Sequence, residues 1–118
     1  EFYYKFSIVF KNMITFEEFQ KLDLRVAKII KAEKIENSEK LLRLEVDIGD
    51  ETRQIIAGIG RVYNSEDLID KEIIIVANLE PKKLMGLESQ GMILAADSDS
   101  GPVLLRPEKD VLPGTKIK

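Results

Sequence analysis

The sequence contains no cysteine, no histidine and no tryptophan, and aromatic residues make up only 7% of its 118 residues. Without cysteine, disulfide bonds and thiolate chemistry are excluded. Without histidine, so are Ser–His–Asp catalysis, histidine proton transfer and zinc sites built from histidine or cysteine. No apolar run approaches the ~20 residues of a membrane-spanning helix. We therefore expect no catalytic residue, no metal, no cofactor and no membrane partner.

What remains is typical of one ordinary globular domain. Hydrophobic residues make up 44% of the chain and charged residues 33%. A chain of this size buries roughly two-thirds of the surface that its unfolded form exposes, which is enough for a single core. The net charge is −3 and the sequence pI is about 5.1. This charge disfavours nonspecific binding of polyanions through bulk charge, but it leaves room for a local basic face.

A helix is predicted near residues 15–22. Thr15 and Glu18 in "TFEE" have the spacing of a capping box, and Ile14 and Phe19 have that of a hydrophobic staple. The aromatic-rich stretch before them differs from the rest, and Met13 is a candidate start. We therefore expect an N-terminal extension over residues 1–13 and a single domain over residues 14–118.

The end of this helix is ambiguous from the residues alone. A helical period of apolar residues continues to about Lys34, and no Gly or Pro interrupts it before Gly49. However, the alternation in "LRVAKIIK" also fits a bent strand with a bulge. Both interpretations remain open at this point.

The rest of the chain reads as short strands. "LLRLEVDIG" alternates apolar and charged residues, and a turn at Gly49–Glu51 joins it to "TRQIIAGIG" as a hairpin. "EIIIVANL" indicates a buried strand, and "YNSEDL" offers Asn64 or Ser65 as the N-cap of a short helix near residues 65–69. "GMILAA" and "VLLRP" flank "DSDSG" as a second hairpin, and "PGTKIK" closes the chain. Five or six such strands predict a barrel or a sandwich.

Three short motifs resemble functional sites without matching them. "GLESQG" has Ser89 one position too late for a nucleophile elbow, and no histidine is present to act as its base. "GIG" at 58–60 lacks the third glycine of a dinucleotide fingerprint. "DSDSG" at 97–101 lacks the closing Glu of a calcium loop. We interpret them as a polar loop, a strand bend and a hairpin turn.

Basic residues gather in two places. The stretch 21–45 carries seven basic and five acidic residues, which is typical of a solvated mixed face. Lys82 and Lys83 are adjacent, and only Glu80 and Glu88 are acidic near them. "PKKLMGLESQG" can therefore be a loop that contacts phosphates or an ordinary charged loop after a strand.

Taken together, several segments resemble a known family. They are "DLRVAKIIKAE", "KLLRLEVDIG", "RQIIAGIG", "VANLEPKKLMGLESQGMILAA" and the terminal "PG". Their order and spacing are similar to those of the tRNA-binding domain found at the C-terminus, or as a separate β chain, of methionyl-tRNA synthetases. Free-standing structure-specific tRNA-binding proteins and the endothelial monocyte-activating polypeptide family share this domain. The resemblance covers residues 14–118 and is most specific between Val76 and Ala96.

The resemblance implies an all-β fold with short helices, namely a five-stranded Greek-key barrel of the OB type. It also implies that the helix stops near Leu22 and that Leu24–Glu33 forms a bent first strand. The apolar "MILAA" is expected to be buried in the barrel core and to serve a dimer contact.

For function, the resemblance implies noncatalytic recognition of tRNA by its shape, usually by a homodimer. Ser89 and Met92 in "SQGM", with Gln90 between them, match loop positions associated with tRNA contact. Asn78, Lys82 and Lys83 lie on the same segment and are predicted to meet phosphates. Charge and predicted strand face add four further candidates: Arg53, Lys31, Lys40 and Arg43.

The implied role is that of the β subunit or an appended domain of methionyl-tRNA synthetase. Such a domain would capture tRNA in the cytoplasm for a separate catalytic synthetase chain. The alternative is a protein-interaction module like the chaperone-like dimeric relatives that share this barrel. An enzyme of this size would have to work with carboxylates alone.

Overall fold

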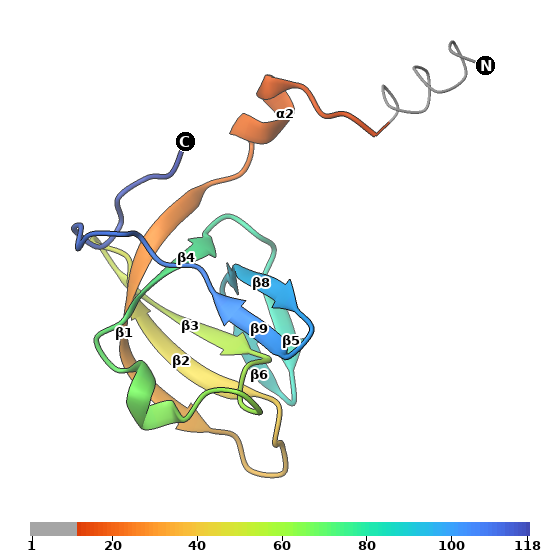
Figure 1. Cartoon of the computed structure of the whole chain (residues 1–118), viewed down its shortest axis with the longest axis vertical. Helices are drawn as coiled ribbons and strands as arrows, with labels where there is room; N and C mark the ends of the chain where they lie inside the picture. The colour runs from red at the N-terminus through yellow and green to blue at the C-terminus, as the bar shows by residue number, and fades with distance from the viewer. Residues whose placement is uncertain (1–11) are drawn as a thin grey trace.

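The computed structural model describes residues 12–118, so most of the predicted extension over residues 1–13 lies outside the described residues. Two short helical elements and nine strands make up this part of the chain (Figure 1). The helical elements are α2 (Phe16–Gln20) and the 3-10 helix η1 (Ser65–Leu68). The strands are β1 (Leu24–Lys34), β2 (Leu42–Asp47), β3 (Thr52–Ala57), β4 (Glu72–Val76), β5 (Lys82–Leu84), β6 (Leu87–Ser89), β7 (Met92–Ile93), β8 (Ala95–Ser98) and β9 (Gly101–Leu104).

The main sheet is antiparallel and has the order β3-β2-β1-β4-β7. The long strand β1 pairs with β4 through its first half and with β2 through its second half, so it belongs to both sides of the curved sheet. A register shift between Ile29 and Lys31 marks a β-bulge, which bends the strand. The result is a nearly closed, OB-like five-stranded barrel, which confirms the predicted fold class.

The boundary between helix and strand follows the family resemblance and not the helical period. Helix α2 ends at Gln20 and β1 begins at Leu24, so continuation of the helix to Lys34 is wrong. The capping box is confirmed: the Glu18 amide donates to Thr15 Oγ1 at 3.1 Å, and the Thr15 amide donates to Glu18 Oε1 at 3.2 Å. The pairing of β1 with two neighbours outweighs its local helical pattern.

The core lies inside the barrel and consists of aliphatic side chains from every strand of the main sheet except β7. Leu42, Leu44 and Val46 are buried on alternate positions of β2, as their spacing predicted. All five residues of β4 are buried, since both faces of this strand are covered. Ile93 of β7 is only partly buried, while Met92 is 46% exposed. The segment "MILAA" therefore serves the core only in part, since Ile93 packs against it while Met92 and Ala96 are exposed.

The barrel closes at a seam where β3 meets the end of β6 and the residues that follow it. The Gln90 amide donates to the Gln54 carbonyl at 2.8 Å, and the Ile56 amide donates to Ser89 Oγ at 3.0 Å. Gly91 follows with φ +141°, and a β-carbon there would lie 3.0 Å from the Val76 carbonyl oxygen. Glycine is needed at this position because the two backbones approach so closely.

The C-terminal segment runs back along the start of β1. The Ile117 amide donates to the Leu24 carbonyl at 2.9 Å, and Arg25 forms a bridge with Lys116. The Pro-Gly turn predicted before this segment is present, with Gly114 at φ +88°. This closing segment covers the end of the barrel next to α2 (Figure 1).

Candidate nucleic-acid interface

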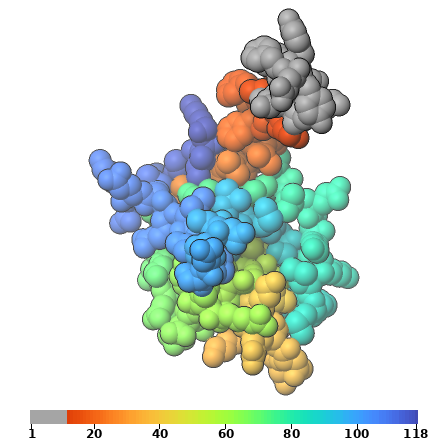
Figure 2. All heavy atoms as spheres, turned by 45° about the vertical axis from the view of Figure 1, so that its right-hand side comes forward, coloured from red at the N-terminus to blue at the C-terminus, as the bar shows by residue number. Residues whose placement is uncertain are grey.

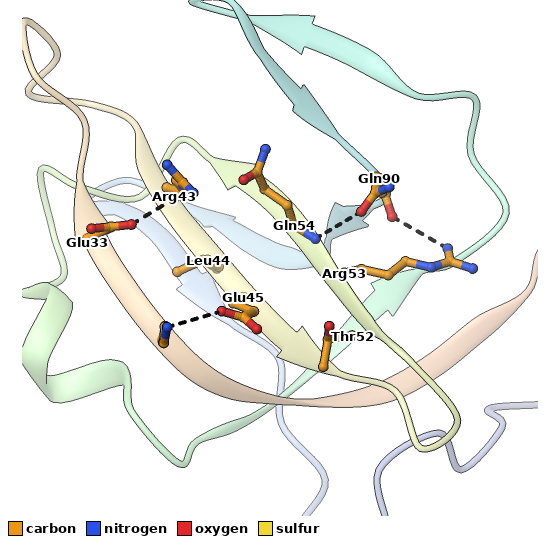
Figure 3. A pocket seen from close by; sticks show the side chains of 9 residues that line it. Glu33, Arg43, Leu44, Glu45, Thr52, Arg53, Gln54 and Gln90 are labelled. Atoms are coloured by element: carbon orange, nitrogen blue, oxygen red, sulfur yellow. Dashed lines mark hydrogen bonds and ion pairs between the residues drawn. The ribbon is translucent and has the colours of Figure 1, made fainter.

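A polar groove of about 350 Å³ lies on the face formed by β1, β2 and β3. It is lined by Lys31, Glu33, Arg43, Leu44, Glu45, Thr52, Arg53, Gln54 and Gln90 (Figure 3). Arg43 and Glu45 face it because they alternate along β2 with the core residues. Of the ten predicted contact residues, four lie here: Lys31, Arg43, Arg53 and Gln90.

Each cation of this groove already has a carboxylate beside it. Lys31 Nζ lies 3.9 Å from Glu45 Oε2, and Arg43 Nε lies 3.6 Å from Glu33 Oε1. Both pairs are cross-strand neighbours of β1 and β2. Exposed pairs of this kind contribute only about 0–1 kcal/mol to stability, so they can open to meet another anion.

Arg53 is held more firmly than the other cations. Its Nε donates to Glu51 Oε1 at 2.5 Å, and its Nη1 donates to the Ala77 carbonyl and, at 3.5 Å, to the Gln90 carbonyl. Its side chain is only 26% exposed. The guanidinium therefore connects β3 to the residue that follows β4. Arg53 thus has a structural role at the edge of the groove.

Lys82 and Lys83 project on a separate hairpin beside the groove. Strands β5 and β6 pair only with each other, through a turn at Met85 and Gly86 in which both φ angles are positive. Both lysines are exposed, and neither forms an ion pair within residues 12–118. Figure 2 shows the segment after β4 reaching outward along one flank of the molecule.

Ser89 occupies a different environment from the predicted polar loop. It ends β6, is only 5% exposed, and its Oγ accepts from the Ile56 amide while donating to the Gly91 carbonyl at 3.0 Å. The polar-loop interpretation of Ser89 is therefore wrong. Its hydroxyl is buried and bonds two backbone groups, the Ile56 amide and the Gly91 carbonyl, where the barrel closes. Neighbouring Gln90 is exposed, and its Oε1 accepts from the Gln54 amide at 3.1 Å.

The remaining predicted residues lie around these two features. Met92 and Lys82 share an apolar hollow of about 150 Å³ below the hairpin. Lys40 is exposed outside the groove, and its methylene chain covers Gly58. The carboxamide of Asn78 accepts from the Asp23 amide and donates to the Lys21 carbonyl, so both of its polar atoms have protein partners.

Sequence reasoning missed Gln54 and the acidic members of the groove. Gln54 is uncharged, so charge gives no sign of it in the sequence. The sequence indicates only a mixed face for Glu33 and Glu45, because their pairing depends on the register between β1 and β2. Residues 12–118 contain no cluster of acidic side chains suited to a metal ion and no helix long and apolar enough to cross a membrane.

The fold and the groove define a small OB-like barrel with a polar sheet face and a basic hairpin at its side. Residues 24–116 match the family described as "Putative tRNA binding domain". The chain therefore belongs to the tRNA-binding domain family, as the sequence resemblance implied.

The relatives found by sequence are much longer proteins. The chain is 53% identical over 107 residues to the methionine–tRNA ligase of Archaeoglobus fulgidus, and 54% identical over 106 residues to that of Caldanaerobacter subterraneus. These alignments cover 91% and 90% of this chain, but only 16% and 17% of the relatives. The chain thus corresponds to about one-sixth of the ligases it matches.

Two solved structures resemble the whole barrel. A protein related to methionyl-tRNA synthetase from Pyrococcus horikoshii is 38% identical, with a TM-score of 0.85, and the match covers 91% of this chain and 99% of that one. The chaperone CsaA of Bacillus anthracis is 37% identical, with a TM-score of 0.82, covering 90% and 99%. The same barrel therefore occurs in proteins named for two different roles.

Proposed function

We propose that this chain is a noncatalytic, structure-specific tRNA-binding module. It would serve as the β subunit or an appended domain of methionyl-tRNA synthetase in the cytoplasm. The observation that carries the proposal is the exposed pair Lys82 and Lys83, free of ion pairs within the described residues, beside a polar groove in a member of the tRNA-binding domain family. Phosphate contacts of this kind supply affinity without reading sequence.

In this proposal the hairpin and the groove hold different parts of the RNA backbone. Lys82 and Lys83 meet phosphates directly, and Lys31 and Arg43 do so after leaving their carboxylate partners. Three further predicted residues are exposed and would extend the contact area: Gln90 in the groove, Met92 below the hairpin and Lys40 outside the groove. Arg53, Asn78 and Ser89 act instead by holding the surface in shape, since their polar groups already bond the protein.

The module would act by raising the local concentration of tRNA near a catalytic synthetase chain. We also propose that it works as a homodimer. Large apolar side chains that remain exposed near α2 and the C-terminal segment support this, among them Phe16 at 71% and Leu112 at 81%. Sedimentation at micromolar concentration should give a dimer, and Phe16→Ser should weaken it while Glu17→Ser should not. A monomeric native chain would contradict the dimer.

Gel retardation tests the proposed function. Folded tRNA should be retarded by the purified chain, and duplex DNA of similar length should bind much more weakly, because the recognition is of RNA shape. Equal affinity for both would contradict structure-specific recognition. Chemically unfolded tRNA of the same sequence provides the control that separates shape from charge.

The second candidate function is that of a chaperone-like protein-interaction module, and the structural match to CsaA favours it. Such a module would hold clients by apolar surface, for which the exposed Leu79, Met85 and Met92 are available. Salt separates the two candidates. High salt should abolish tRNA binding but spare or strengthen the binding of an unfolded apolar client.

A further inference from the structure

The β5–β6 hairpin that carries Lys82 and Lys83 is not part of the main sheet. It forms a two-stranded sheet of its own, with three residues in each strand. A two-stranded hairpin is at best marginally stable by itself in water. Its orientation relative to the groove must therefore be set by contacts with the barrel.

Those contacts are concentrated on β3, and several of them use side chains. The Gln54 backbone exchanges hydrogen bonds with Gln90: its carbonyl accepts from the Gln90 amide at 2.8 Å, and its amide donates to Gln90 Oε1 at 3.1 Å. Two residues further along β3, the Ile56 amide donates to Ser89 Oγ. These three bonds fix the chain where it leaves the hairpin, at the seam of the barrel.

A fourth bond reaches into the hairpin itself. The carboxamide of Gln54 donates from Nε2 to the Glu88 carbonyl at 2.8 Å. Glu88 stands in the middle of β6 and is the register partner of Lys83. Gln54 also lines the groove, so one side chain joins the groove face to the strand opposite the lysines.

We propose that Gln54 is a positioning residue for RNA binding. It holds the β5–β6 hairpin in an orientation that lets Lys82, Lys83 and the groove contact the same RNA molecule. This inference rests on the proposed tRNA binding and adds a residue that carries no charge and needs no contact with the RNA. The Gln54–Glu88 bond adds to the bonds at Ser89 and Gln90 and holds the middle of β6 beside the groove. Without that bond, the two lysines remain present, but the hairpin is held to β3 only by the bonds at Ser89 and Gln90.

The test is a double-mutant cycle in the full chain. Gln54→Met removes the donor at similar size and without adding charge, and Gln20→Met is the matched control on the exposed face of α2. Each is combined with Lys82→Ala/Lys83→Ala, and tRNA affinity is measured across a salt series well below the melting temperature.

In the wild-type chain, Lys82→Ala/Lys83→Ala lowers the logarithm of the tRNA affinity by a certain amount. We expect this amount to fall by roughly half or more in the Gln54→Met background, because the effects of residues that act as a unit are not additive. The salt slope of Gln54→Met should also approach that of the lysine double variant. Gln20→Met should leave the lysine effect unchanged. A general loss of folding stability would not produce this result. It lowers the fraction of folded protein but does not change how much the two lysines contribute to the tRNA affinity of the folded protein.

Amide hydrogen exchange provides the second readout. Gln54→Met should speed exchange in residues 82–89 while the amides shared by β1 and β2 keep their protection. An additive cycle, or unchanged exchange in the hairpin, would overturn the positioning role even if the native chain binds tRNA. If the native chain does not bind folded tRNA, the proposed function fails and the positioning role with it.

Discussion

Asn78 and Asp23 are joined by a hydrogen bond of 2.8 Å in which Asn78 Oδ1 accepts from the Asp23 amide. The same carboxamide donates to the Lys21 carbonyl at 2.6 Å. Asn78 follows β4, whereas Lys21 and Asp23 link α2 to β1, so one side chain fastens two segments that are 55 residues apart in sequence. A residue predicted to meet phosphate therefore has a second role in the fold.

We expect Asn78→Ala to lower the free energy of unfolding by about 1–3 kcal/mol, because two backbone groups lose their partner. Urea denaturation measures this, with the exposed Asn12→Ala as the control. The tRNA affinity of the folded fraction should change less than it does on removing Lys82 and Lys83. A large affinity loss at unchanged stability would make Asn78 a direct RNA contact.

Lys82→Ala/Lys83→Ala should weaken tRNA binding and flatten its salt dependence. Each lost phosphate contact should reduce the slope of log K against log salt by about 0.7–0.9. Arg106→Ala/Lys109→Ala removes the same charge from the segment after β9, which lies on the opposite flank in Figure 2. If both double variants gave the same slope, net charge and not the hairpin would account for binding.

Acid should destabilise the protein partly through Asp23. Arg25 Nε donates to both carboxylate oxygens of Asp23, at 3.0 and 3.2 Å, and this holds the pKa of Asp23 below its ordinary value of 3.8. Because the folded pKa is depressed, the stability contributed by Asp23 is present above the unfolded value. It is lost as the pH falls through the folded pKa.

Asp23→Asn should therefore lower stability near neutral pH and make the loss of stability below about pH 4 less steep. Urea denaturation at a series of pH values measures both effects. Asp99→Asn, in the exposed turn between β8 and β9, should leave the pH profile as it is. An unchanged profile for Asp23→Asn would show that its pairing with Arg25 does not contribute.

Ser89→Ala should destabilise the barrel seam by about 1–3 kcal/mol, since it leaves the buried Ile56 amide and Gly91 carbonyl without this partner. The exposed Ser100→Ala is the control. Thermal denaturation should show the difference, while tRNA affinity well below the melting point should fall only slightly. Equal melting temperatures for the two variants would mean that other groups bond the Ile56 amide and the Gly91 carbonyl.

Local pattern predicted much of the fold, because the β2 alternation, the capping box and the turns depend on neighbouring residues. It did not place Lys31. Ile29 and Lys31 would share one face of a regular strand, but the bulge between them directs Ile29 into the core and leaves Lys31 exposed beside Glu45. A bulge of this kind depends on how β1 bends to pair with two strands, which no local pattern contains.

The candidate site divides in the same way. Lys82 and Lys83 were predicted from charge alone and are exposed, but they stand in strand β5 and not in the predicted loop, and their contact with RNA stays a prediction. The burial of Ser89 could not be predicted, because its hydroxyl replaces a ladder partner across the seam with β3. Gln54 was missed for the same reason, since its bond to Glu88 exists only once the barrel has closed.

The carboxylates paired with Lys31 and Arg43 have a consequence for partner choice. In the proposed function, an anion that enters the groove would replace a carboxylate that already lies beside each cation, so a single phosphate would gain little. A rigid array of phosphates, presented to both cations at once, would replace both carboxylates together. Glu33 and Glu45 would then favour ligands whose negative charge is dense and rigidly held.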